Sequence, residues 1–246
     1  MTDIKFSPVV KLPKVNRGNF SAMLARPQEF GGLMNPLIGF DHFRLTGDVF
    51  GPHQHTGMSA LSYVFEDSVT YNNQDSMGTN LDIEPGSLLW TWAGSGVTHH
   101  EVPVKQDGQV HGLQIFLKIP QQNAAKPPQS VYIPVKEMPV LNDNGIKVKV
   151  VAGNSGTLLN HVQTPEPVTI LDITMKAGSS FTHELPPNTH GTFYVMSGKV
   201  TLSTGERNID IADEEVISIG GKDTGTVVIL RSTPASRVIF IGGLPV

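Results

Sequence analysis

The sequence predicts an all-β protein, and two observations carry that prediction. Its apolar segments are short, rich in β-branched or aromatic residues, and bounded by Gly, Pro, Asn or Asp. No stretch of about 15 residues shows the 3.6-residue apolar period of an amphipathic helix. Many short strands with such turns are typical of sandwiches and barrels. The clearest predicted strands are 59–65, 112–119, 168–175 and 227–230.

The composition fits a compact chain with many turns. Of the 246 residues, 39% are hydrophobic and only 16% are charged, and 25 are glycine and 18 proline. A net charge of −4 without a basic block argues against direct binding to nucleic acid or to a membrane surface. No segment approaches the about 18 apolar residues of a membrane span, and the N-terminus lacks the apolar stretch of a signal peptide. We therefore expect a cytoplasmic protein.

The chain contains no cysteine, which excludes disulfides, thiolate metal sites and a catalytic thiol. A metal site or a nucleophile must therefore use imidazole, carboxylate or hydroxyl groups. The nine histidines become the residues of interest. Two of them, His42 and His111, stand alone, and a role in a pocket or in the core is the simpler expectation for both.

An internal repeat divides the chain into two halves. Residues 62–70 (SYVFEDSVT) resemble residues 193–201 (FYVMSGKVT), with Tyr, Val, Val and Thr in register. A polar, proline-rich segment, residues 121–130, is predicted as a loop between the halves. The alternative is a generic hairpin pattern that matches by chance. We predict an N-terminal domain of residues 1–133 and a C-terminal domain of residues 134–246.

Two pairs of residues in the first half have the spacing of metal ligands. One residue separates His53 from His55, and one separates His99 from Glu101. Residues i and i+2 of a strand point to the same face, so each pair can aim into one cavity while His100 points away. Three imidazoles and a carboxylate occupy only part of an octahedral coordination shell, so positions remain for water, substrate or O₂. Such a ligand set suits Fe(II), Mn(II), Ni(II) or Cu(II). From spacing alone, a solvated loop is the alternative.

The order of these motifs resembles the pirin family of bicupins. The resemblance is carried by residues 51–57 (GPHQHTG), 61–66 (LSYVFE), 73–78 (NQDSMG), 85–90 (PGSLLW) and 93–101 (AGSGVTHHE). It weakens in the second half but covers nearly the whole chain. It implies two jelly-roll-like cupin β-barrels packed face to face, with one mononuclear metal in the N-terminal barrel. The matching ligand positions are His53, His55, His99 and Glu101.

The resemblance also implies a metal and an activity. Fe(II) is the first expectation, with Mn, Ni, Cu or Zn as alternatives. The implied activity is that of a quercetin 2,3-dioxygenase, which cleaves a flavonol or a similar enolic aromatic substrate with O₂, and Glu101 would accept the substrate's proton. A redox-responsive, non-enzymatic regulator that binds a protein partner is the alternative. A third reading is a cupin that binds a sugar or a small acid and carries an idle metal.

Two departures from the family pattern lead to expectations. Thr56-Gly-Met-Ser59 stands where pirins commonly have a basic residue and a carboxylate, so we expect a change in the wall of the site or in the residues that support the ligands. In the second half, Gly220–Gly225 stands in the place of the His-x-Glu run. We therefore expect the second barrel to lack a metal, with His183 and Glu184 covering its mouth. Five apolar residues are candidates for the cavity wall, and strand alternation allows only some of them: Leu61, Tyr63, Trp90, Trp92 and Phe116.

Overall fold

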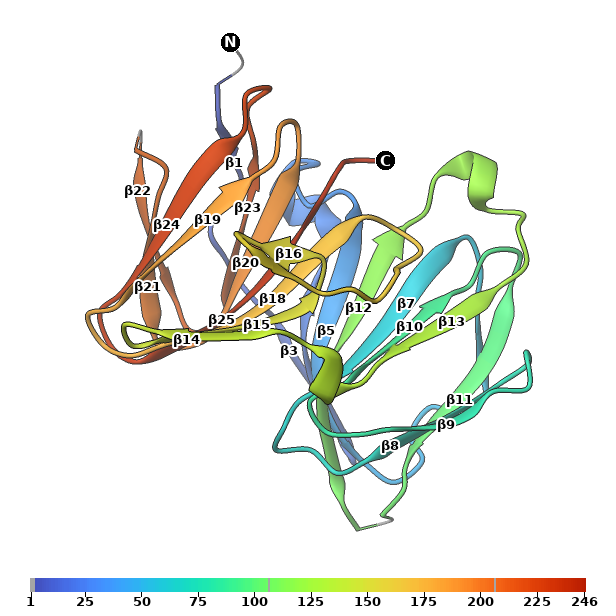
Figure 1. Cartoon of the computed structure of the whole chain (residues 1–246). Coiled ribbons are helices and arrows are strands. Elements are labelled where there is room, and N and C mark those ends of the chain that lie inside the picture. Colours follow the sequence, from blue (N-terminus) through green and yellow to red (C-terminus); the bar gives the residue numbers. More distant parts are fainter. Residues whose placement is uncertain (1–2, 106, 206) are drawn as a thin grey trace.

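The computed structural model describes residues 3–105, 107–205 and 207–246, and it confirms the all-β prediction (Figure 1). Two β-barrels lie side by side. The described residues contain no α-helix but three short 3-10 helices, η1 (Pro27–Phe30), η2 (Gln121–Asn123) and η3 (Val135–Glu137). No helix in this part of the chain is long and apolar enough to cross a membrane.

The first barrel consists of a seven-stranded and a four-stranded antiparallel sheet. The larger sheet has the order β13 (Gln129–Ile133), β10 (Leu88–Trp92), β7 (Met58–Val64), β12 (Gln109–Lys118), β5 (Leu37–Thr46), β4 (Phe20–Ala25) and β3 (Lys14–Arg17). The smaller sheet has the order β6 (His53–His55), β11 (Val97–Pro103), β8 (Tyr71–Asp75) and β9 (Asn80–Ile83). Apolar side chains fill the interior, among them Phe43, Val64, Ile83 and Val110.

The second barrel repeats this plan. Its large sheet has the order β1 (Lys5–Phe6), β23 (Glu215–Gly220), β20 (His190–Ser197), β25 (Ser236–Gly243), β18 (Val168–Met175), β15 (Ile146–Ala152) and β14 (Val140–Asp143), and β2 (Val10–Lys11) also pairs with β23. Its smaller sheet has the order β19 (Ser180–Leu185), β24 (Thr226–Ser232), β21 (Lys199–Ser203) and β22 (Asn208–Ala212). A short hairpin is formed by β16 (Asn154–Ser155) and β17 (Leu158–Leu159).

The internal repeat corresponds to equivalent places in the two large sheets. Its motif begins on β7 in the first half and on β20 in the second, and β20 lies between β23 and β25 as β7 lies between β10 and β12. The edge next to these strands differs, because β13 pairs with β10 whereas β1, from the start of the chain, pairs with β23. N-terminal residues thus complete the sheet of the second barrel. The division of the chain at residue 134 stays a prediction.

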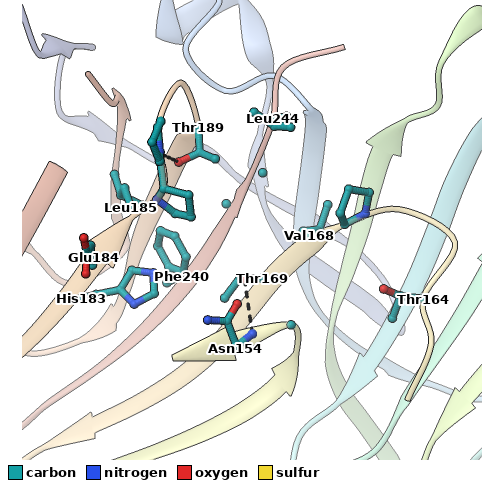
Figure 2. A pocket seen from close by; sticks show the side chains of 16 residues that line it. Asn154, Thr164, Val168, Thr169, His183, Glu184, Leu185, Thr189, Phe240 and Leu244 are labelled. Atoms are coloured by element: carbon teal, nitrogen blue, oxygen red, sulfur yellow. Dashed lines mark hydrogen bonds between the residues drawn. The ribbon is translucent and has the colours of Figure 1, made fainter. Parts of the chain in front are cut away.

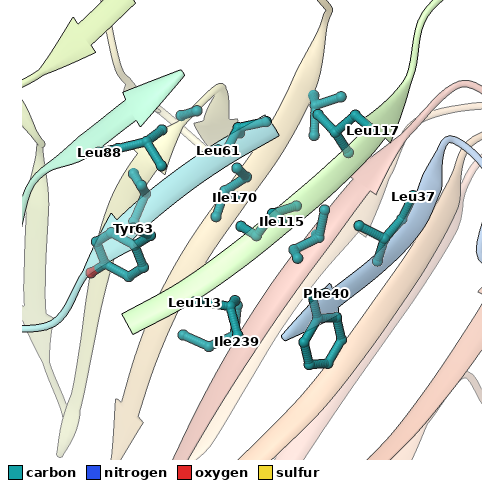
Figure 3. Packing of buried hydrophobic residues seen from close by; sticks show 14 of the residues in the cluster. Leu37, Phe40, Leu61, Tyr63, Leu88, Leu113, Ile115, Leu117, Ile170 and Ile239 are labelled. Carbon is teal, nitrogen blue, oxygen red and sulfur yellow. The ribbon is translucent and has the colours of Figure 1, made fainter. Parts of the chain in front are cut away.

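Apolar side chains of both large sheets fill the space between the barrels (Figure 3). Leu61, Leu113 and Ile115 of the first sheet share one buried cluster with Ile170 and Ile239 of the second. Burying such a side chain contributes about 1.5 to 3 kcal/mol relative to leaving it exposed. The central strands are therefore covered on both faces, and nearly every residue of β7 and β10 is buried.

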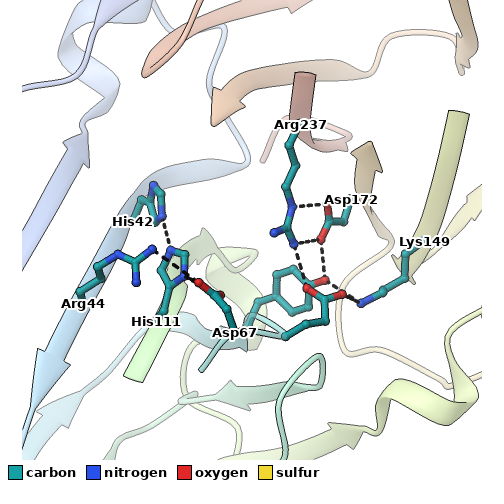
Figure 4. A network of polar contacts seen from close by, with 9 residues as sticks. His42, Arg44, Asp67, His111, Lys149, Asp172 and Arg237 are labelled. Atoms are coloured by element: carbon teal, nitrogen blue, oxygen red, sulfur yellow. Dashed lines mark hydrogen bonds and ion pairs between the residues drawn. The ribbon is translucent and has the colours of Figure 1, made fainter. Parts of the chain in front are cut away.

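A partly buried ion network also joins the barrels (Figure 4). The guanidinium of Arg237 donates to Asp172 at 2.5 and 2.9 Å and to Glu66 at 3.0 Å. Lys149 forms a second ion pair with Glu66, and the hydroxyl of Tyr63 donates to Asp172 at 2.8 Å. Glu66 and Tyr63 belong to the first barrel and the other three residues to the second. The network therefore fixes one barrel against the other.

His42 and His111 lie in a second chain of hydrogen bonds between the barrels (Figure 4). The hydroxyl of Tyr194, from β20, donates to Nδ1 of His42 at 2.6 Å. Nε2 of His42 lies 2.7 Å from Nε2 of His111, whose Nδ1 donates to Asp67 at 2.7 Å. These partners fit when both rings are neutral and His42 donates from Nε2. The two single histidines thus have a structural role in the interface.

Acid is expected to destabilise the fold in part through His42. Burial, followed by the neighbouring His111, lowers the pKa of His42 from 6.5 to about 3. The unfolded chain therefore binds a proton here before the folded protein does, and stability is lost as the pH falls below 6.5. One such group contributes a slope of about 1.4 kcal/mol per pH unit. Denaturant unfolding over this range should give a flatter pH dependence for His42→Phe, and equal slopes would contradict the assignment.

Candidate metal centre

Strand pairing brings three of the four predicted ligands together. β6 pairs with β11 so that His53 lies opposite His99 and His55 lies opposite Val97. His53 and His55 share one face of β6 because side chains alternate along a strand. Within the described ranges, these three histidines form the only group of three or more potential ligands, and their ligand atoms lie within 4.8 Å of one another.

The distances within this histidine cluster match those around a single ion. Nε2 of His99 lies 3.0 Å from Nε2 of His53 and 3.1 Å from Nε2 of His55. Two neighbouring nitrogens that each lie about 2.1 Å from an octahedral ion are about 3.0 Å apart. The cluster can therefore bind a metal without a large rearrangement of the rings.

The outer nitrogens of the cluster set its protonation. Nδ1 of His53 donates to the carbonyl oxygen of Gly51 at 3.0 Å, and Nδ1 of His99 faces Oδ1 of Asn73 at 3.0 Å. With its hydrogen on Nδ1, the ring of His99 presents a bare Nε2 to the cluster, and His53 turns its own Nε2 toward the same point. Burial, followed by the neighbouring histidines, lowers the pKa of His99 to about 3, and burial followed by His53 lowers that of His55 to about 4. Neutral imidazoles of this kind suit a metal ion.

Glu101, the fourth predicted ligand, is not a member of the histidine cluster. Its carboxylate accepts a hydrogen bond from the hydroxyl of Ser62 at 2.6 Å, and only 7% of the residue is exposed. Burial raises the pKa of Glu101 to about 7, although the bond from Ser62 acts against the shift. Glu101 lines the same cavity as His53 and His55. Its role as a ligand stays a prediction.

Two turns hold β6 and β11 in place. His100 faces away from the cluster, where its Nε2 contacts Asp48 at 2.9 Å. Asp48 also accepts a hydrogen bond from the backbone of Gly51 at 3.1 Å, which ties the turn before β6 to β11. The turn before β11 requires Gly94, because its φ is +49° and a Cβ would lie 2.2 Å from the carbonyl oxygen of Lys126.

A cavity of 230 Å³ opens beside the histidine cluster. Besides His53, His55 and Glu101, its wall has an aromatic portion made of Phe20, Phe43, Phe50, Tyr71 and Phe116. Of the five apolar candidates from the sequence, only Phe116 lines this cavity. The other four, Leu61, Tyr63, Trp90 and Trp92, lie in the cluster between the barrels. Strand alternation is compatible with either face of the sheet for these four residues. In the structure they lie on the face that the second barrel covers.

None of residues 56–59 lines the cavity, so an effect of this segment on the site would act through neighbouring residues and stays a prediction. Ser59 is fully buried on the face of β7 that meets the second barrel, and its hydroxyl donates to Oε2 of Glu166 at 2.9 Å. The hydroxyl of Thr56 faces the carbonyl oxygen of Gly94 at 3.5 Å. Within this segment, Ser59 thus contacts the interface between the barrels and Thr56 contacts the turn before β11.

The second barrel has apolar residues where the first has ligands. β19 and β24 occupy the places of β6 and β11, and His183 lies opposite Val228. The buried positions of β24 include Val228 and Leu230. Gly220–Gly225 lies at the end of β23 and in the turn before β24, so it is not the counterpart of the His-x-Glu run. Within the described residues, this barrel has no group of three potential ligands.

Three polar residues of the site are not among the predicted site residues, although Ser62 and Asn73 lie within the motif segments 61–66 and 73–78. Asn73 is fully buried and orients His99, and the hydroxyl of Ser62 contacts both Glu101 and Oε1 of Gln114. Each occupies a strand position that faces the barrel interior. A polar residue at a strand position that faces the interior is the available signal, but it requires knowledge of which face is the interior.

Both halves of the chain match profiles of one protein family. Residues 26–117 match the family profile "Pirin", and residues 170–246 match that of the "Pirin C-terminal cupin domain". A Pseudomonas aeruginosa protein with a provisional assignment as a quercetin 2,3-dioxygenase is 27% identical over 202 residues, which are 80% of this chain and 69% of that protein.

Two solved structures share the fold. Quercetin 2,3-dioxygenase from Acinetobacter baumannii superposes with a TM-score of 0.85 at 19% identity, covering 99% of this chain and 88% of its own. The bacterial pirin YhhW from Escherichia coli, in complex with nickel(II), superposes with a TM-score of 0.72 at 18% identity, covering 99% of this chain and 100% of its own. The bicupin architecture expected from the sequence is therefore confirmed.

Proposed function

Because the chain belongs to the pirin family, we propose that it cleaves a flavonol or a similar enolic aromatic compound with O₂, as a quercetin 2,3-dioxygenase does. In this proposal His53, His55, His99 and Glu101 hold one divalent metal ion. The observation that carries it is the convergence of three Nε2 atoms beside a cavity with an aromatic wall. The names of the Pseudomonas and Acinetobacter relatives support the choice of substrate.

Fe(II) is the metal that we propose first, and Mn, Ni, Cu or Zn can use the same nitrogen and oxygen ligands. When bound, a redox-active metal supplies a Lewis acid that orients the substrate and O₂ and transfers electrons between them. The nickel(II) complex of the E. coli pirin supports a metal in this fold. The protein's part is to hold the rings of His53 and His99 in one tautomer through Gly51 and Asn73.

Glu101 is the proposed proton acceptor. Burial raises its pKa to about 7, so its carboxylate can take a proton from an enolic hydroxyl near neutral pH. Ser62 holds this carboxylate on the cavity side of the barrel. Phe43, Tyr71 and Phe116 then provide an aromatic wall for the rings of the substrate. In this proposal Glu101 transfers the proton, and the aromatic side chains orient the substrate.

The cavity must widen before a flavonol can enter it. At 230 Å³ it is smaller than the about 300 to 1,000 Å³ of typical small-molecule sites. Phe50 stands at its rim with 54% of the residue exposed and packs edge-on against Phe20 at 4.9 Å between ring centroids. In this proposal, Phe50 turns outward to admit a flavonol.

The test is metal analysis of the purified protein, followed by quercetin turnover after loading with each of the five metals. We expect O₂ uptake and loss of quercetin absorbance only in loaded protein. Failure to take up any of these metals would contradict the metal centre. Metal uptake without turnover would contradict the dioxygenase and favour the regulator, which would bind a protein partner differently in the Fe(II) and Fe(III) forms.

Replacing Asn73 by leucine is expected to weaken metal binding by about 10- to 100-fold, because His99 loses the partner that fixes its ring. The measurement is a competition for Ni(II) against a colorimetric chelator. Asn72→Leu is the matched control, since Asn72 bonds to Asn80 and Asp82 instead of a cluster histidine. An equal loss in both variants would show that strand β8, and not the orientation of His99, is responsible.

A further inference from the structure

The cavity beside the histidine cluster has a second carboxylate in its wall. Besides Glu101, the side chain of Asp41 lines it. Asp41 lies on β5 directly opposite Gln114 of β12, and Gln114 lies opposite Ser62 of β7. Residues opposite one another in antiparallel strands point to the same face, so these three side chains form one polar row across the sheet. Asp41 is at one end of this polar row, and Glu101 is bound to Ser62 at the other.

The polar row sets the separation of the two carboxylates. Neighbouring strands lie about 4.8 Å apart, so Asp41 and Ser62, which are two strands apart, are separated by about 10 Å along the sheet. The hydroxyl of Ser62 donates to Oε1 of Glu101 at 2.6 Å. A molecule that contacts both Glu101 and Asp41 therefore needs two polar groups at separate places.

One oxygen of Asp41 is available to such a molecule. Its Oδ1 is buried and lies 2.6 Å from Nη1 of Arg26. This contact is an ion pair and not an aligned hydrogen bond, because the same Nη1 donates to the carbonyl oxygens of Ala25 at 2.9 Å and Phe40 at 3.2 Å. The side chain of Asp41 is still 21% exposed, and none of the described residues donates a hydrogen bond to its Oδ2.

The ion pair with Arg26 determines which group suits Oδ2. Arg26 balances the charge of Asp41, so this end of the cavity does not require a cation. A carboxylate oxygen accepts hydrogen bonds and cannot donate them, and its bonds are roughly twice as strong as those of a neutral acceptor. Phe43, on the same face of β5, also lines the cavity. A neutral hydroxyl on an aromatic ring is therefore the matching donor.

From these observations we propose that Asp41 determines substrate specificity by accepting a hydrogen bond from a second hydroxyl of the substrate. This role rests on the proposed function, because the enolic hydroxyl of the substrate is taken to lie at Glu101. The preferred substrates are then flavonols, or similar enolic aromatic compounds, that carry a further hydroxyl on another ring. A substrate with the enolic hydroxyl alone leaves Oδ2 of Asp41 without a partner inside the cavity, which costs affinity.

The second barrel also contains a cavity, and a test must distinguish the two. Its volume is 360 Å³, and one carboxylate, that of Glu184, is among the groups described as lining it. Figure 2 shows Glu184 with His183 and Phe240 at this cavity. None of the residues described as lining it also lines the cavity in the first barrel. Glu184→Ala therefore removes the carboxylate of the second barrel's cavity and serves as a control.

The test compares two flavonols with metal-loaded protein, quercetin and 3-hydroxyflavone, which has no hydroxyl besides the enolic one. The measured quantity is the ratio of kcat/KM for quercetin to kcat/KM for 3-hydroxyflavone. We expect this ratio to fall about tenfold from wild type to Asp41→Leu, because one charge-assisted hydrogen bond is lost. Arg26→Leu removes the ion pair but keeps Oδ2 of Asp41, so this variant and Glu184→Ala should retain the wild-type ratio.

Three results would overturn the proposal. They are an unchanged ratio in Asp41→Leu, an equal fall in Arg26→Leu, which would assign the effect to the ion pair, or an equal fall in Glu184→Ala, which would place the hydroxyl in the second barrel. If circular dichroism shows that Asp41→Leu does not fold, Asp41→Asn replaces it. This variant keeps the shape of the side chain without its charge and should lower the ratio about threefold, and an unchanged ratio rejects the proposal.

A failure of the proposed function gives a different result. In that case the loaded wild-type protein oxidises neither flavonol. The role of Asp41 is then decided by the affinities of the two flavonols, measured through quenching of tryptophan fluorescence. Asp41→Leu should weaken quercetin binding about tenfold more than 3-hydroxyflavone binding, and an equal effect on both rejects the role of Asp41.

Discussion

Replacing His99 by alanine is expected to abolish metal binding and, with it, all metal-dependent consumption of O₂. Nε2 of His99 contacts the Nε2 atoms of both His53 and His55, so its loss removes the shared member of the cluster. Losing only a residue that orients a ligand costs about 10- to 100-fold in affinity, and losing the ligand should exceed that range. Metal content after dialysis and quercetin turnover measure the effect.

His100→Ala is the matched control for this prediction. It changes the next residue of the same strand, but His100 faces away and contacts Asp48. We expect full metal content and unchanged turnover. Circular dichroism must show that both variants are folded, because His99 is only 2% exposed and its removal leaves a gap. Retention of the metal in His99→Ala would contradict the histidine cluster as the metal centre.

Replacing Arg237 by leucine is expected to lower the free energy of unfolding by about 3 to 5 kcal/mol. The change leaves the carboxylate of Asp172, whose side chain is 4% exposed, without its cation, and an unpaired buried charge is costly. Glu66 retains Lys149, so the loss should centre on Asp172. Urea unfolding of wild type and variant measures the difference.

Two further variants test the cause. Lys105→Ala breaks an ion pair with Asp107 at 3.8 Å in which both side chains are largely exposed, and such pairs contribute about 0 to 1 kcal/mol. The double variant Arg237→Leu with Asp172→Leu should recover part of the stability, because apolar residues often replace a buried ion pair without loss. A double variant less stable than Arg237→Leu alone would show that the network's packing, and not its charge, matters.

The sequence predicts features that depend on neighbouring residues, and it does not predict contacts between residues that are far apart in the chain. The predicted strands 59–65 and 168–175 correspond to β7 and β18, because alternation and turn residues are local properties. Asn73, in contrast, is 26 residues from His99, and Tyr194 is 152 residues from His42. No local pattern pairs residues at such distances. The pairing of β1 with the sheet of the second barrel is of the same kind.

The sequence by itself determined the all-β class, the duplicated halves and a site restricted to imidazole and carboxylate groups. Strand alternation, which is a local property, placed His53 and His55 on one face and His100 on the face opposite to His99. Only the tertiary structure decided which face each strand turns to the cavity. The tertiary structure brought the Nε2 atoms of three histidines together and placed the carboxylate of Glu101 in a hydrogen bond with Ser62. It also buried Leu61 and the residues around it against the second barrel. The physical reason is that register and packing depend on contacts between strands far apart in the chain.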